Sequence, residues 1–119
     1  MIITEGLRYA DEKQPVTAAA ALLCRVEYAA SALFVFDHEQ ACLGVCLFDT
    51  EYGRIGLPLP AGACSAWLMS NHPTGDEIPN EADIRNARLL RHLLGRRRVR
   101  FFMTGEMIGC RETDLSVDD

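Results

Sequence analysis

The fold is decided by the stretch Asn80–Gly95, which reads NEADIRNARLLRHLLG and is the clearest helix of the chain. Asn80 is a favourable N-cap residue, and Asp83 places an acid in the first turn, where the helix dipole favours negative charge. One face carries apolar residues at helical spacing: Ile84, Ala87, Leu90, Leu93 and Leu94. Gly95 is typical of a helix C-terminus, so we expect the helix to end there.

Short runs rich in β-branched and aromatic residues surround this helix and predict strands. They cover residues 32–36, 41–48, 64–70 and 99–104. The first two are separated by a turn at residues 37–40 and could form a hairpin. An alanine-rich stretch after Pro15, residues 16–27, predicts a second helix. Strands mixed with two helices indicate an α/β or α+β layer fold.

The composition is that of a globular protein. The chain has 119 residues, of which 49% are hydrophobic and 24% charged, and we expect one domain over residues 1–119. Residues 1–14 would be an arm or edge segment, and residues 111–119 an acidic tail. Five cysteines without a C-x-x-C pair indicate reduced thiols and a cytoplasmic protein. The apolar runs are far shorter than a membrane span requires.

Two features of the chain have structural explanations. Cys42 and Cys46 are predicted to share one face of a strand, where they would serve in packing. Arginines also gather in sixteen positions, at Arg85, Arg88, Arg91, Arg96, Arg97, Arg98 and Arg100. Such a cluster could contact nucleic acid or an acidic partner. Because the formal net charge of the chain is −5, we expect no nucleic-acid binding and interpret the cluster as a solvated surface.

One segment, residues 70–83 (SNHPTGDEIPNEAD), has the residue types of a metal site. His72 comes just after a predicted strand, and Asp83 lies in the first turn of the predicted helix. A strand end and a helix N-terminus can deliver two ligands to one ion, and imidazole and carboxylate suit zinc. A simpler explanation also fits the same residues. Asn80 and Asp83 form an ordinary capping pattern, and His72 would hydrogen-bond within the loop.

These residues resemble the JAMM/MPN (JAB) metalloprotease domain, most closely the type found at the C-terminus of bacterial RadC proteins. That type reads His-x-His-Pro-Ser-Gly, then four residues ending in proline, then Ser-x-x-Asp. The present chain has NHPTG at residues 71–75, then residues 76–79 ending in Pro79, then Asn80-x-x-Asp83. The spacing of eleven residues from His72 to Asp83 is the same in both. The resemblance covers about residues 27–108.

The resemblance implies a JAMM/MPN-like (cytidine-deaminase-like) fold, which is a mixed, mostly antiparallel sheet with helices packed on it. It also implies a zinc-dependent hydrolase of peptide or isopeptide bonds, acting on a protein or peptide substrate or a ubiquitin-like partner. His72 and Asp83 would bind zinc, and Asn80 would stabilise the tetrahedral intermediate in place of the family's serine. Glu27 would be the general acid/base, with Glu39 as the alternative.

Ser70 stands where the family has its first metal-binding histidine. A serine hydroxyl is a poor zinc ligand, so two protein ligands remain where catalytic zinc sites have three. The missing ligand could come from Asp76, Glu77 or Cys64, or a hard ion such as Mg²⁺ could replace zinc.

Two hypotheses remain open, a metallohydrolase whose degenerate site binds zinc weakly, and a catalytically silent scaffold or binding module with the same fold. A third hypothesis is a role in DNA repair, and the arginine cluster is its sole support.

Overall fold

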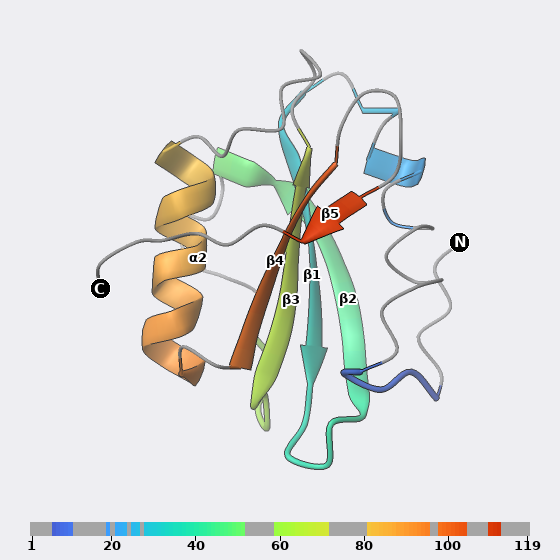
Figure 1. The fold of residues 1–119 in the computed structure, drawn as a ribbon, viewed down its shortest axis with the longest axis vertical. Helices are drawn as coiled ribbons and strands as arrows, with labels where there is room; N and C mark the ends of the chain where they lie inside the picture. The colour runs from blue at the N-terminus through green and yellow to red at the C-terminus, as the bar shows by residue number, and fades with distance from the viewer. Residues whose placement is uncertain are drawn as a thin grey trace.

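The computed structural model describes residues 6–10, 19, 21–23, 25–26, 28–51, 59–71, 81–95, 98–104 and 110–112. At its centre is a five-stranded sheet in the order β2-β1-β3-β4-β5 (Figure 1). The strands are β1 (Ala30–Phe36), β2 (Cys42–Asp49), β3 (Ser65–Asn71), β4 (Val99–Thr104) and β5 (Cys110–Glu112). The β3–β4 pair is parallel, and the other neighbouring pairs are antiparallel. The predicted α+β class and mixed, mostly antiparallel sheet are therefore confirmed.

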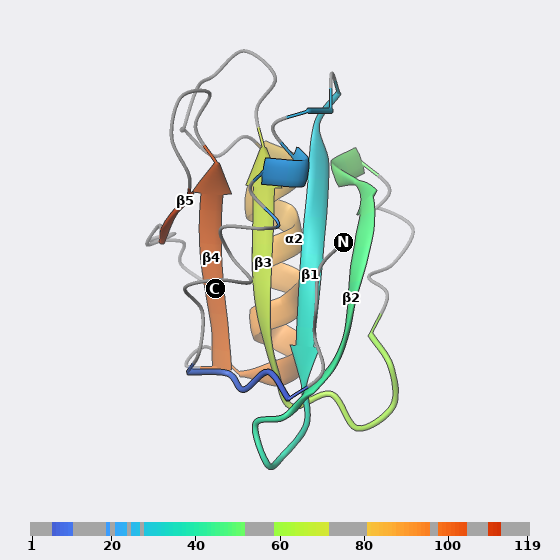
Figure 2. The same ribbon diagram turned by 90° about the vertical axis from the view of Figure 1, so that its right-hand side faces the viewer.

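Helix α2 (Glu81–Leu94) follows β3 in the chain and precedes β4, which returns parallel to β3. The helix packs on one face of the sheet (Figures 1 and 2), and Leu7, Ala19 and Leu23 belong to the core on the other face. Each face has its own core because successive side chains of a strand point to opposite sides. Trp67 and Met69 of β3 lie in the core away from the helix, and the alternate residues of β3 lie in the helix-side core.

The predicted hairpin is present, since β1 and β2 pair antiparallel around a turn at residues 37–41. The Asp37 carboxylate accepts hydrogen bonds from the backbone N–H groups of Ala41 (3.0 Å) and Glu39 (2.8 Å). The bond from Ala41 is the main reason that the pKa of Asp37 lies below its ordinary value of 3.8. Gln40 adopts a left-handed backbone with φ of 67°, which closes the turn.

We expect Asp37→Asn to remove part of the acid dependence of stability. A carboxyl whose pKa is lowered by folding stabilises the folded state above its unfolded pKa, and that stabilisation is lost as pH falls through the folded pKa. The wild-type chain should therefore lose more stability than the variant between pH 5 and pH 3, as measured by urea unfolding. Identical losses in both chains would contradict this role of Asp37.

The prediction for α2 is right in its bounds and only partly right about its buried face, to which Leu94 also belongs. Ala87 and Leu90 are buried as expected, but Leu93 is 54% exposed and Ile84 is half-buried on the outer side. The side facing the sheet instead begins with two polar residues, Asp83 and Asn86, both 0% exposed. The first turns of the helix therefore turn polar side chains toward the sheet, and Asn86 donates a hydrogen bond to the carbonyl of Thr50.

Two further predictions, on the cysteines and on the C-terminal tail, need correction. Cys42 and Cys46 lie on opposite faces of β2, because the register shifts by one residue between Val35 and Phe36 and a one-residue shift reverses the faces. Both are free thiols and only partly buried. The strand β5 falls partly inside the predicted tail. In the described part of the chain, none of the helices is long and apolar enough to cross a membrane.

Candidate functional site

The helix-side layer of the fold becomes polar at one end, where β3 ends and α2 begins. Five polar side chains are completely buried there, and we call them the buried polar cluster: Ser31, Thr50, Ser70, Asp83 and Asn86. They come from β1, β3, α2 and the residue that follows β2. Buried polar groups lower stability unless they find partners, so this end of the layer is either a structural network or a site.

The topology brings these residues together. Ser31 and Ser70 are paired across the β1–β3 ladder and share the face that carries Leu33 and Leu68, which is the face covered by α2. Helix α2 starts beyond the end of β3, so its first turns lie over this end of the sheet (Figure 1). Asp83 and Asn86 are three residues apart in the helix and therefore lie on the same side of it.

Three hydroxyl groups form a continuous hydrogen-bonded chain, which we call the hydroxyl chain. Ser31 Oγ lies 2.9 Å from Ser70 Oγ and 2.8 Å from Thr50 Oγ1. A hydroxyl donates one hydrogen bond and accepts others, so the central Ser31 can donate to one neighbour and accept from the other. The Ser70 hydroxyl is thus committed to a protein partner inside the molecule.

The helix contributes an amide and a carboxylate to the cluster. Asn86 Nδ2 donates to the backbone carbonyl of Thr50 at 3.1 Å, which ties α2 to the end of β2. The Oδ1 atom of Asn86 is buried without a hydrogen-bond partner among the described residues. Asp83 lies in the first turn of α2, where the free N–H groups and the helix dipole stabilise a negative charge.

On the opposite face of the sheet, Asn71 ends β3 and joins three segments. Its Oδ1 accepts a hydrogen bond from the Ala30 N–H at 2.6 Å. Its Nδ2 donates to the carbonyls of Leu23 at 2.7 Å and Tyr28 at 3.4 Å. The last described residue before His72 is therefore fixed in place.

The structure places part of the predicted site. Ser70 and Asp83 lie at the same end of the helix-side layer, as the metal-site hypothesis requires. The other candidates, His72, Asp76, Glu77, Asn80 and Glu27, lie outside the described residues.

Two of the alternatives lie at the other end of the sheet. Glu39 is exposed in the β1–β2 turn, and Cys64 precedes Ser65, which pairs with Phe36 beside that turn. Five residues of strand separate Ser65 from Ser70, or about 16 Å. Neither Glu39 nor Cys64 can act at the buried polar cluster.

The described donors do not fit a catalytic zinc ion. Zinc takes thiolate, imidazole and carboxylate, whereas the cluster offers three hydroxyls, an amide and one carboxylate. No group of three His, Cys, Asp or Glu side chains that could hold a metal occurs among the residues described. The hydroxyl of Ser70 lies where the family resemblance places an imidazole, and it binds Ser31 instead.

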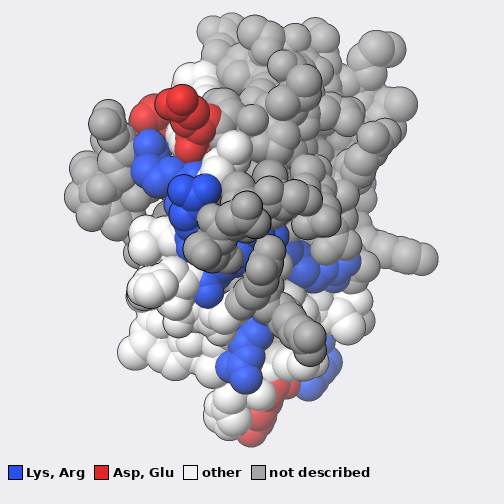
Figure 3. Space-filling view, turned by 60° about the vertical axis from the view of Figure 1, so that its left-hand side comes forward, with Lys and Arg blue, Asp and Glu red and all other residues white. Residues whose placement is uncertain are grey.

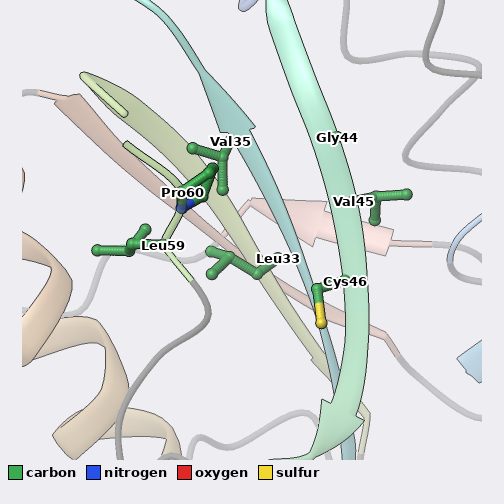
Figure 4. A pocket seen from close by; sticks show the side chains of 7 residues that line it. All are labelled: Leu33, Val35, Gly44, Val45, Cys46, Leu59 and Pro60. Atoms are coloured by element: carbon green, nitrogen blue, oxygen red, sulfur yellow. The ribbon is translucent and has the colours of Figure 1, made fainter. Parts of the chain in front are cut away.

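A hollow lies on the helix-side face of the sheet, beside the β1–β2 hairpin. It has a volume of about 470 Å³ and lies between these two strands and the segment that contains Leu59 and Pro60 (Figure 4). Its described lining is aliphatic apart from the Cys46 thiol, so it offers no acid, base or metal ligand set. We therefore assign no chemistry to it.

Sequence reasoning singled out Ser70 and Asp83 but missed Ser31, Thr50 and Asn86. Ser31 and Thr50 are ordinary residues next to strands, and nothing in their spacing distinguishes buried hydroxyls from exposed ones. Asn86 gave a usable signal, because it lies three residues after Asp83 and would share its helix face. No protein-family model matches the chain, and a search of curated proteins found no match.

Proposed function

We propose that this chain is a JAMM/MPN-like domain whose metal site has become a structural network, and that it acts as a binding or scaffold module. One observation carries the proposal. Ser70, in the place of the family's first metal-binding histidine, is 0% exposed and belongs to the hydroxyl chain through its 2.9 Å contact with Ser31. A catalytic zinc is held by three protein ligands, and a serine hydroxyl that is hydrogen-bonded to another serine does not supply the third.

The fold is compatible with this lineage. The mixed, mostly antiparallel sheet and a helix that begins at the end of β3 agree with what the resemblance implies. The shared location of Ser70 and Asp83 at one end of the layer also agrees with descent from a metal site. Stoichiometric zinc would favour the alternative, a peptidase or isopeptidase with a degenerate site.

We expect the purified, untagged chain to contain far less than one zinc per protein and to be insensitive to chelation. A resident ion at 100 times its dissociation constant would stabilise the fold by about 2.7 kcal/mol, or about 10 °C in melting temperature for a domain of this size. Elemental analysis and thermal unfolding with and without EDTA measure both quantities. A zinc-to-protein ratio near one that is abolished by His72→Ala would contradict catalytic silence.

Restoring the missing imidazole tests the lineage itself. Ser70→His should gain zinc binding that the wild type lacks, because His72, Asp83 and the new imidazole would supply three ligands. Ser70→Asn is the matched control, since it adds a polar side chain of intermediate size without a zinc ligand. Calorimetric titration with zinc compares the two variants, and circular dichroism verifies that both are folded. A folded Ser70→His variant that binds no more zinc than Ser70→Asn would contradict the JAMM/MPN assignment.

A further inference from the structure

The outer side of α2 carries a hollow of about 780 Å³ that the family resemblance does not explain. We call it the arginine groove, and its described lining is Ile84, Arg85, Arg88, Leu89, Arg91 and His92, with Glu81 in the first turn. These residues recur every three or four positions, so they form one stripe on the side opposite the sheet. Figure 3 shows basic side chains gathered along the side of the molecule that α2 forms.

The groove combines positive charge with apolar surface. Three arginines and one acidic residue, Glu81, line the groove, and Glu51 lies beside Arg85, in a chain whose formal net charge is −5. Ile84 and Leu89 lie between the arginines and are half-buried. A surface that served solubility alone would not place aliphatic side chains inside a hollow between cations, since water solvates such surface poorly.

Arg85 can be reached from this surface, because its side chain is 38% exposed. Its Nε and Nη2 atoms are buried and have no hydrogen-bond partner among the described residues. Glu51 Oε2 lies 3.9 Å from Nη2, which is an ion pair too long for a hydrogen bond. An incoming carboxylate would therefore meet the exposed part of a guanidinium group to which no described carboxylate is hydrogen-bonded.

We propose that the arginine groove is a docking surface for an acidic polypeptide segment that carries both carboxylates and aliphatic side chains. Charge complementarity requires an anionic occupant, which excludes a second copy of the same basic face. Ile84 and Leu89 favour a polypeptide over a nucleic acid, whose backbone offers no aliphatic side chains. The net negative charge of the whole chain would repel a long polyanion but would affect a short peptide much less.

The dimensions suit a short linear segment. From Glu81 to His92 the helix rises about 16 Å, at about 1.5 Å per residue. An extended peptide covers that length with about five residues. The interface would be small, so we expect weak, salt-dependent binding with a dissociation constant on the order of 10–100 μM.

Fluorescence anisotropy with the full chain tests the proposal. The probe is a labelled peptide of about eight residues that alternates Asp or Glu with Leu, with a Ser-Gly peptide of equal length and a single-stranded oligonucleotide as comparison probes. Reversing two charges in the groove, as in Arg85→Glu/Arg88→Glu, should weaken binding of the acidic peptide at least about tenfold, because each reversal converts an attraction into a repulsion. The matched control, Arg25→Glu, changes an exposed arginine outside the groove and should weaken binding less than about twofold.

Three results would overturn the proposal. The first is an acidic peptide that binds no more tightly than the Ser-Gly peptide. The second is an equal loss of peptide affinity in Arg25→Glu and in the groove variant, which would show that net charge alone governs binding. The third is an oligonucleotide that binds more tightly than the peptide and depends on the same arginines. None of these outcomes bears on zinc, so the proposed function and this docking surface can fail separately.

Discussion

Trp67→Ala should lower the free energy of unfolding by about 3–5 kcal/mol, the largest effect that we expect from one substitution. Trp67 is 0% exposed in the middle of β3. Its ring lies 4.6 Å from the ring of Phe36 and 5.2 Å from that of Phe34, measured between centroids, and Tyr9 and Phe102 complete the cluster at 6.3 Å. Truncation would leave a cavity among rings that belong to different segments, so the whole sheet would lose support.

Urea unfolding followed by circular dichroism measures this loss. Trp67→Phe is the matched variant, and we expect it to cost only about 1 kcal/mol because an aromatic ring still fills most of the space. The indole Nε1 also has no hydrogen-bond partner among the described residues, so its removal gives up no hydrogen bond. Leu93→Ala, at a side chain that is 54% exposed, should change stability by less than about 0.5 kcal/mol. Equal losses for Trp67→Ala and Leu93→Ala would contradict the role of this cluster.

The core of the fold could be predicted from local residue patterns. The four predicted strands and the helix agree with β1 to β4 and α2 to within one or two residues at each end. Strand β3 was recognisable because Trp67, Leu68 and Met69 are buried on both faces and form a continuous apolar run. Gly95, with φ of 105°, follows the last helical residue as its position in the sequence predicted.

The structural features that the sequence did not predict depend on tertiary contacts. The short strand β5 pairs with β4 and forms the edge of the sheet, which no local pattern could indicate. The buried polar start of α2 was not predictable either, because the partner of Asn86, the carbonyl of Thr50, lies 36 residues earlier in the chain. Cys42 and Cys46 face opposite sides of the sheet because β2 has one extra residue, Leu43, in its pairing with β1.

The candidate site was predictable to the same limited degree. The motif spacing was enough to place Ser70 and Asp83 at one end of a layer, because a strand end and the following helix start must meet there. The hydrogen-bonding of Ser70 was not predictable, because its partner Ser31 lies 39 residues earlier in the chain. The pairing of Ser70 with Ser31 is thus a property of the sheet register.

Asn71→Ala should cost about 3 kcal/mol in the free energy of unfolding, which is the second large effect that we expect. The substitution removes one acceptor and two donor hydrogens, and it leaves the Ala30 N–H and the carbonyls of Leu23 and Tyr28 without their side-chain partner. Each buried polar group that loses its partner costs about 1–3 kcal/mol, less where water can reach it, as it can at Tyr28. The start of β1 and the segment that covers the sheet should both loosen.

Asn86→Ala is the matched control, because it removes the same side chain from a completely buried position but breaks one hydrogen bond, to Thr50. We expect that variant to lower the free energy of unfolding by about 1 kcal/mol. Native-state hydrogen exchange separates the two effects, since the Ala30 amide should exchange faster in Asn71→Ala and at its wild-type rate in Asn86→Ala after correction for global stability. If Ala30 keeps its protection when Asn71 is truncated, the side chain of Asn71 does not hold the start of β1.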